Sequence, residues 1–277
     1  MRKHILSAFP MVLGLVGVAA AGAPDDCKGP SADCVAVGSW NFSIALGAGA
    51  MSNPLVDGKP IPLVVVPQFS YYGKRFFIND LDFGFTLAES DRSTFNLVAS
   101  PGYDRVFFYR SDLQNVFVSG FGRAAALVRP DAVGATQVAP RPRRVTYLAG
   151  PEWTFKSGGI SGQLDVLHEI TEQNHGTEVR AAAGLPLLES KGTLTANVGM
   201  TWKSAAIVNY YYGAGRIYRA GPAFDPFFKL GYTLPLTGKW RFYTFAQYER
   251  LADAIVDSPI VVERYVATGF IGAIYTF

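Results

Sequence analysis

The sequence has 277 residues, of which 49% are hydrophobic and 17% charged, so it is too apolar and too weakly charged for a disordered protein. The formal net charge is only +3, which argues against a nucleic-acid partner, because phosphate binding usually requires a concentrated basic face. Aromatic residues reach 14%, led by 20 Phe and 14 Tyr, and this excess favours strands and suits membrane interfaces.

The first residues have the pattern of a secretory signal peptide. A basic start at residues 2–4 is followed by an apolar or small stretch over 5–21 and by further small residues. We expect cleavage after Ala21, because cleavage after Ala23 would place Pro24 first in the mature chain. An uncleaved anchor is the alternative, but the apolar stretch is short for a spanning helix, which needs about 20 residues.

Two cysteines, Cys27 and Cys34, follow the predicted cleavage site. Cys27 lacks the small apolar residues that a lipoprotein site has before its cysteine, so we do not expect lipidation. In an oxidising periplasm the two form a candidate disulfide, with two free thiols as the alternative. Two cysteines and three histidines do not give zinc-site spacing, and no metal or cofactor is expected.

Alternation with period two dominates the rest of the chain. Residues 39–51 and 193–203 have the cleanest pattern, and Val198 lies on the apolar face of the second segment while Thr195 lies on the polar face. In 159–171, the polar face carries Gln163, Asp165 and Glu169, and in 239–251 one face carries Tyr243, Phe245 and Gln247. A soluble sandwich would alternate in the same way, but in a transmembrane barrel one face contacts lipid and the other lines the lumen.

The pattern gives eleven candidate strands, which lie near 39–51, 60–72, 74–89, 93–103, 143–156, 159–171, 177–188, 191–203, 224–236, 239–251 and 263–277. A bacterial barrel with both ends in the periplasm has an even number. We therefore predict twelve, with the missing strand in 104–142 around 115–128; ten is the alternative. Pro67 and Pro151 lie within candidate strands and predict a bulge or a strand end.

Beyond the signal, no apolar run is long enough for a transmembrane helix. In a membrane, a closed β-barrel is the other structure that satisfies every backbone hydrogen bond. The predicted fold class is all-β: an antiparallel transmembrane β-barrel after a cleaved signal peptide. The predicted organisation is a signal at 1–21, a periplasmic segment at 22–38 and an outer-membrane barrel at 39–277. The predicted location is the outer membrane of a Gram-negative bacterium.

The segment 104–144 is basic, with seven arginines against three aspartates. Counting strands backwards from a periplasmic C-terminal residue places this segment outside the cell. Arg141, Arg143 and Arg144 are then candidate contacts for lipopolysaccharide phosphates, which guanidinium groups bind with paired donors. A solvated loop whose arginines balance acids elsewhere is the alternative.

The C-terminal strand ends in Phe277, with Tyr275 two residues before it. A terminal aromatic residue preceded by alternating apolar side chains matches the assembly signal of outer-membrane barrels. We expect the barrel-assembly machinery to pair with this strand by β-augmentation.

Some outer-membrane barrels are enzymes, so a catalytic function has to be considered. Barrel phospholipases and lipid A deacylases use a His and a Ser two residues apart on one strand face, and neither His168 nor His175 has such a partner. Asp165 or Glu169 near His168 would suit general acid–base work, but polar residues lining a wet lumen are much the better explanation. We therefore predict a protein that is not an enzyme.

Several segments resemble the MipA/OmpV family of MltA-interacting proteins. The matching stretches include Asn53-Pro54-Leu55, Ile61-Pro62-Leu63, the run from Pro67 to Phe77, Leu81 to Leu87, Asn209 to Gly213, Tyr248 to Ala254 and Asp257 to Val261. The resemblance implies an outer-membrane, non-enzymatic scaffold that links a lytic transglycosylase to a peptidoglycan synthase. The family offers no catalytic or ligand-binding motif to transfer, and the arginine-rich segment departs from its pattern.

The leading functional hypothesis is thus a scaffold barrel that binds peptidoglycan-remodelling enzymes. The expected partners also include outer-membrane lipid, lipopolysaccharide and the barrel-assembly machinery. A small-solute channel is one alternative, since polar residues would wet the lumen. A surface adhesin or antibiotic-response barrel is the other.

Overall fold

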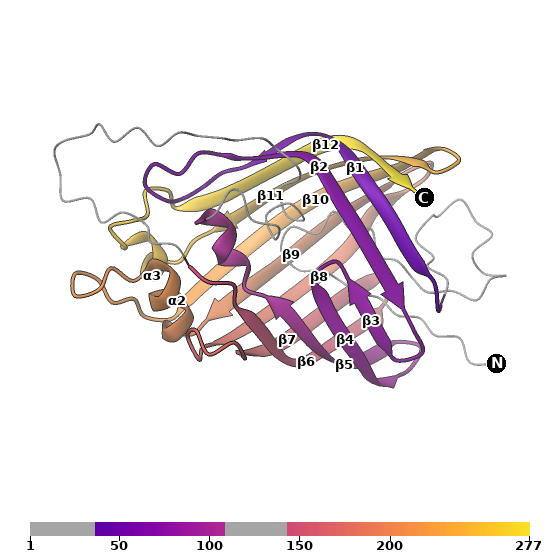
Figure 1. The fold of residues 1–277 in the computed structure, drawn as a ribbon. Helices are drawn as coiled ribbons and strands as arrows, with labels where there is room; N and C mark the ends of the chain where they lie inside the picture. The colour runs from indigo at the N-terminus through magenta and orange to yellow at the C-terminus, as the bar shows by residue number, and fades with distance from the viewer. Residues whose placement is uncertain (1–36, 109–142) are drawn as a thin grey trace.

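The computed structural model describes residues 37–108 and 143–277, and within these ranges an antiparallel barrel closes from strands that follow one another in sequence order (Figure 1). β1 completes the circle by pairing with β12. The strands are β1 (Trp40–Met51), β2 (Ile61–Tyr72), β3 (Phe76–Asn79), β4 (Asp82–Glu89), β5 (Ser93–Pro101), β6 (Tyr147–Ser157), β7 (Ile160–Glu169), β8 (Thr177–Glu189), β9 (Thr193–Lys203), β10 (Ala223–Thr237), β11 (Trp240–Arg250) and β12 (Tyr265–Thr276). The helices are η1 (Tyr103–Phe107), α2 (Ala205–Tyr212) and α3 (Asp253–Val256). Across the two described ranges, none of the helices combines the length and apolar content needed to span a membrane.

The connections differ at the two ends of the barrel. β6 and β7 are joined by Gly158 and Gly159, both with positive φ, which is the geometry of a tight two-residue hairpin turn. α2 and α3 lie in longer loops at the end opposite the C-terminus (Figure 1). Outer-membrane barrels keep short turns in the periplasm and longer loops outside, so the end with α2 and α3 is assigned to the cell exterior.

The predicted count of twelve strands is confirmed, but the predicted place of the missing strand is wrong. The circle closes without residues 109–142, so the suggested strand at 115–128, which lies outside the described residues, is not needed. Instead the candidate 74–89 is two strands, β3 and β4, separated by a reversal at Asp80. Asp80 has a positive φ of 53°, and aspartate tolerates this conformation better than most residues, so an apparently continuous alternation conceals a turn.

The prolines within strands mark gaps in the pairing. β3 pairs with β2 only through Ser70 to Tyr72, so Pro67 lies on a stretch of β2 that has no β3 partner. In the β6–β7 ladder, the pairs at Gly150 and Pro151 are missing without any change of register. Proline lacks a backbone N–H, so it is accommodated where the hydrogen-bonded pairing of two strands is interrupted. Neither proline lies at a strand end, which was one of the two predicted possibilities.

The predicted division into two faces is confirmed. Val198, Leu164 and Trp40 are exposed on the outer surface, whereas Gln163, Asp165 and Glu169 on β7 are buried in the interior. On β11, the side chains of Tyr243, Phe245 and Gln247 are likewise buried in the lumen. Alternate residues of a strand face opposite sides of a sheet, so the apolar positions form the surface that contacts lipid.

Aromatic side chains gather at both ends of the outer surface, as in the interfacial girdles of membrane barrels. One group lies at the turn end, where Trp40 stacks on Phe42 and Trp240 packs against Tyr275. The other lies at the loop end, where Tyr248 stacks on Tyr265. The two girdles are the expected boundaries of the lipid-facing band.

The junction of β1 and β12 depends on glycine. Gly272 pairs with Gly47, and a Cβ added at Gly272 would lie 2.3 Å from the Leu46 carbonyl oxygen and 2.8 Å from the Gly47 Cα. A Cβ added at Gly269, on the same strand, would meet no atom closer than 3.9 Å. The close approach of the two strands at this junction therefore depends on position 272 having no side chain.

We expect Gly272→Ala to lower the free energy of unfolding by about 1–3 kcal/mol, because the clash is with backbone that cannot rotate away. Gly269→Ala, the matched control, should change it by less than about 0.5 kcal/mol. Urea unfolding of the refolded barrel in lipid vesicles measures both values. Equal values for the two variants would contradict the close approach at this junction.

Candidate functional site

A lid of loop segments covers the external mouth of the barrel. In α2, Ile207, Val208, Tyr211 and Tyr212 lie on one helical face and are buried. They belong to one hydrophobic cluster with residues of the β1–β2, β5–β6 and β11–β12 connections, including Leu55, Val106 and Ile255, and with residues of the upper barrel wall. Burial of this continuous apolar set holds the lid on the mouth.

Specific hydrogen bonds fix the lid. The Tyr211 hydroxyl lies 2.8 Å from the Thr146 hydroxyl, and the Ser258 hydroxyl donates to the Tyr212 carbonyl at 2.5 Å. The Asn209 amide donates to the carbonyls of Ala205 and Ala220 at 2.7 and 2.6 Å. Burial raises the pKa of the Tyr211 and Tyr212 phenols above its ordinary value. The lid is an ordered layer rather than a solvated loop.

Of the predicted lipopolysaccharide contacts, the structure describes two. The Arg143 guanidinium lies over the rings of Phe108 and Tyr210, 5.7 and 5.6 Å from their centroids, and donates to the Tyr211 carbonyl at 3.2 Å. Arg143 is therefore part of the lid, whereas the Arg144 side chain is exposed. Arg141 lies outside the described residues, and phosphate binding by the three remains a prediction.

The other predicted site residues lie at the two ends of the chain. Cys27, Cys34 and the signal at 1–21 fall outside the described residues. The Phe277 N–H donates to the Phe42 carbonyl at 2.9 Å, and its ring packs edge-on against Tyr275 at 5.1 Å. These contacts attach the end of the chain to β1; the role of Tyr275 and Phe277 as an assembly signal stays a prediction.

A charged network lies in the lumen beneath the lid. The Lys203 ammonium is 2.8 Å from an Asp104 oxygen and 3.2 Å from an Asp225 oxygen. The Arg180 guanidinium is 2.6 Å from Glu178, donates to the Ser100 hydroxyl at 2.9 Å, and lies over the Tyr103 ring. Burial raises the pKa of Asp104, and the Lys203 charge opposes this shift. η1 is therefore joined to β9, and through it to β10, by buried ion pairs.

A second polar group continues the network deeper in the lumen. The Asn96 amide donates to Glu152 at 2.6 Å, and the Gln163 amide donates to both Glu152 and Asp165 at 2.9 Å. On the opposite side of the lumen, Tyr243, Phe245 and other apolar residues form a separate buried cluster. Polar and apolar side chains thus occupy the lumen, as the sequence pattern predicted for its inner faces.

The residues considered for acid–base chemistry do not come together. His168 lies on the outer face of β7, where its Nδ1 is 3.1 Å from the Thr177 hydroxyl, while Asp165 and Glu169 are buried on the inner face. Glu169 accepts backbone N–H groups of Gln173, Asn174 and His175 and so shapes the β7–β8 loop. Among residues 37–108 and 143–277, no cluster of three or more His, Cys, Asp or Glu could hold a metal.

The lumen ion pairs were only partly visible in the sequence. Alternation placed Lys203 on the lumen face, but it did not identify its partners, because Asp104 lies in η1, within the β5–β6 connection, and Asp225 lies in β10. Charged residues two apart on an inward face, such as Glu178 and Arg180, are the signal that would have pointed to a buried network.

Comparison with known proteins identifies relatives over most of the chain. A family model described as MltA-interacting protein MipA matches residues 46–277. The MltA-interacting proteins of Escherichia coli strain K12 and of Shigella flexneri are each 25% identical to the chain over 261 residues, which cover 88% of this chain and 93% of the relative.

Solved structures resemble the chain only distantly. The trimer form of OmpT from Vibrio cholerae is 8% identical, with a TM-score of 0.39, over 87% of this chain and 100% of that one. LpxR from Salmonella typhimurium is 11% identical, with a TM-score of 0.35, over 86% of this chain and 99% of that one. Values this low support no argument about function.

Proposed function

The chain belongs to the MltA-interacting protein MipA family, and from this membership we propose that it is a scaffold that binds peptidoglycan-remodelling enzymes in the periplasm. It is an outer-membrane β-barrel. The relatives in Escherichia coli and Shigella flexneri take their name from an interaction with MltA, a lytic transglycosylase. A transglycosylase of that class is the first partner we propose for this chain.

The observation that carries the proposal is the lid. A barrel whose external mouth is covered by a packed apolar cluster has little use as a passage, because an aqueous channel needs a wide and hydrated lumen. Its function then depends on its surfaces. The periplasmic surface is the one that faces the cell wall, and we propose that the partner binds there.

The periplasmic turns offer charged contacts to such a partner. Lys74, Arg75, Arg92, Lys191 and Lys239 are exposed in or beside four of the turns. Among the described residues, the exposed acids in or beside these turns are Asp91 and Glu189, so the turns themselves have an excess of positive charge. Electrostatic attraction of this kind raises the rate at which an oppositely charged partner associates.

Site-specific photocrosslinking in cells tests the proposal. With a photoreactive phenylalanine at Lys191, in the β8–β9 turn, we expect an adduct that contains a lytic transglycosylase. The matched control is the same residue at Ile217, which is 72% exposed in the loop that carries α2 and should give no such adduct. Failure to capture a cell-wall enzyme from Lys191, Lys74 and Lys239 alike would refute the periplasmic scaffold.

The remaining partners have less support. The proposal of a peptidoglycan synthase as a second partner follows from the sequence resemblance. Two further proposals follow from residue chemistry: lipopolysaccharide binds the external arginines, and the barrel-assembly machinery recognises Phe277. The alternative functions, a small-solute channel or a surface adhesin or antibiotic-response barrel, gain no specific contact from the described residues.

A further inference from the structure

A row of polar side chains crosses the inner wall of the barrel from β4 to β7. Thr86 of β4 pairs with Asn96 of β5, and Asn96 pairs in turn with Glu152 of β6. Asp165 of β7 is the partner of Glu152 on its other side. All four side chains are buried on the lumen face. Directly opposed residues on adjacent strands have Cβ atoms about 4.5–5.5 Å apart, so the row forms one continuous polar group.

The two carboxylates of this row share one amide. The Gln163 Nε2 lies 2.9 Å from Glu152 Oε2 and 2.9 Å from each carboxylate oxygen of Asp165. An amide nitrogen carries two hydrogens, so it cannot donate to three oxygens at once. The two carboxylates therefore lie close together around a neutral group that does not balance their charge.

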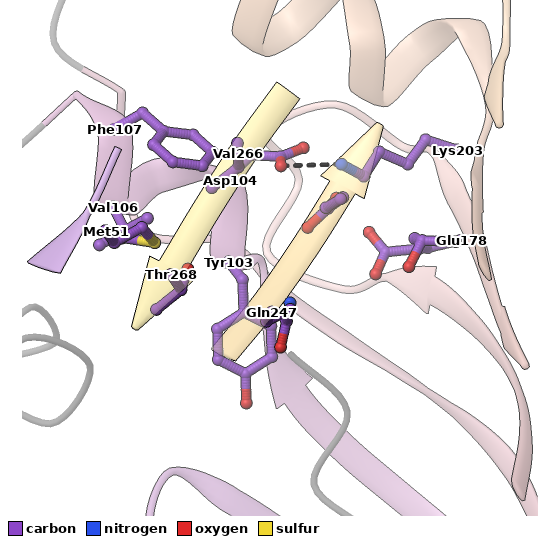
Figure 2. Close-up of a pocket in the computed structure, with 12 residues that line it drawn as sticks. Met51, Tyr103, Asp104, Val106, Phe107, Glu178, Lys203, Gln247, Val266 and Thr268 are labelled. Atoms are coloured by element: carbon purple, nitrogen blue, oxygen red, sulfur yellow. Dashed lines mark hydrogen bonds and ion pairs between the residues drawn. The ribbon is translucent and has the colours of Figure 1, made fainter. Parts of the chain in front are cut away.

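Two acids nearer the lid differ, because each has a cation beside it. Asp104 is 2.8 Å from the Lys203 ammonium (Figure 2), and Glu178 is 2.6 Å from the Arg180 guanidinium. By contrast, the carboxylates that share the amide form no ion pair with any residue in 37–108 or 143–277. Buried carboxylates are costly unless a cation balances them, so this pair favours the binding of one.

Three buried oxygen atoms beside the two carboxylates have no hydrogen-bond partner. They are the Thr86 hydroxyl oxygen, Asn96 Oδ1 and Gln163 Oε1, and none of them is bonded within the part of the chain that the structure describes. Both amides already contact the carboxylates through their nitrogens, and a half-turn of a terminal amide exchanges its nitrogen and oxygen without changing its shape. Unsatisfied buried oxygens cost free energy, and a cation would satisfy them together with the carboxylates.

We propose that a calcium ion binds between Glu152 and Asp165, and that oxygens of Thr86, Asn96 and Gln163 complete its coordination. Ca²⁺ takes roughly six to eight oxygen ligands from carboxylates, amides and similar groups, whereas Mg²⁺ is smaller and usually keeps several waters. Two carboxylates balance the double charge of the ion. The site needs only two acids, so it agrees with the lack of larger acid or histidine clusters among the described residues.

The bound ion would join β4, β5, β6 and β7 across the lumen wall. Its ligands come from four strands, so no motif in the sequence points to it. The site is independent of the scaffold role, because it lies in the lumen and not on the periplasmic turns.

Equilibrium dialysis of the purified, folded barrel against Ca²⁺ tests the proposal. The protein is refolded in detergent without lipopolysaccharide, whose phosphates also bind divalent cations, and is first stripped with a chelator. We expect saturable Ca²⁺ binding, weaker Mg²⁺ binding and a thermal unfolding midpoint that rises with Ca²⁺. Glu152→Gln keeps the side-chain shape and should lower the Ca²⁺ affinity about tenfold or more, because affinity depends on the number of charged ligands. Glu263→Gln, the same change at an exposed loop position, should leave the affinity unchanged.

A second variant, Thr86→Val, separates ion binding from stability. Because the Thr86 hydroxyl has no hydrogen-bond partner among the described residues, its removal should not destabilise the metal-free barrel. It should nevertheless weaken Ca²⁺ binding, and heat-modifiable migration on gels confirms that each variant is folded. Absence of saturable Ca²⁺ binding to the wild-type barrel would overturn the proposal. Unchanged affinity in Thr86→Val, equal affinity of the two glutamine variants, or equal binding of Mg²⁺ would also overturn it.

Discussion

Lys203→Met is expected to lower the free energy of unfolding by about 3–5 kcal/mol, the cost of leaving buried charge without its partner. The Lys203 side chain is 6% exposed, and Asp225, one of its two carboxylate partners, is 0% exposed. Methionine has a similar length but no charge. Asp104 and Asp225 would then face each other in the interior with no cation between them. Equilibrium unfolding of the refolded barrel in lipid vesicles measures the loss.

Lys191→Met is the matched control for this prediction. Lys191 is exposed in the β8–β9 turn and makes no ion pair within the described residues, so the same substitution there should change the free energy by less than about 0.5 kcal/mol. If Lys203→Met proved as mild as the control, the ion pairs beneath the lid would not be a structural element of the barrel.

Val198→Arg is expected to destabilise the barrel by about 2–4 kcal/mol, the cost of a lipid-facing arginine near the bilayer midplane. Val198 is 53% exposed on the outer surface and lies near the middle of β9, where it pairs with Phe228 and Ala183. The guanidinium at this depth would have no water and no counter-charge on the lipid side. Vesicle-based unfolding measures the difference from the wild-type protein.

Thr195→Arg, on the same strand, is the control that tests which face of β9 contacts lipid and which lines the lumen. Thr195 alternates with the exposed positions of β9 and faces the lumen, where polar groups are tolerated. The loss of stability should therefore be smaller than for Val198→Arg. The reverse order would mean that the two faces of β9 had been assigned the wrong way round.

Much of the barrel is predictable from the sequence because its physical cause is local. Side chains alternate across a strand. The residues on either side of Val198 and of Gln163 are therefore enough to predict that Val198 faces lipid and that Gln163 faces the lumen. Tight turns are visible for the same reason, as at Gly158 and Gly159. The split of 74–89 into β3 and β4 was missed, because Phe77, Leu81 and Phe83 stand at alternate positions and so continue one apolar pattern across a turn made by Asp80, which is not a glycine.

The lid and the lumen site depend on long-range contacts. Nothing near Asp104 indicates that it pairs with Lys203, which is distant in sequence, and nothing near Asn96 shows that it contacts Glu152. Arg143 was expected to serve a surface role because isolated arginines in a loop usually meet solvent; its packing between Phe108 and Tyr210 requires α2 to be in place. How the loops fold over the barrel determines such sites. The alternation of polar and apolar residues within a strand carries no information about that folding.

We propose that the barrel acts through its surfaces and not as a passage through its lumen. Conductance of the purified protein in a planar lipid bilayer tests this claim most directly, because the lid and the side chains in the lumen must both be absent for ions to flow. We expect no steady conductance above that of the bare bilayer at any salt concentration. Large ohmic steps that grow in proportion to salt would contradict the account and make the channel hypothesis the better one.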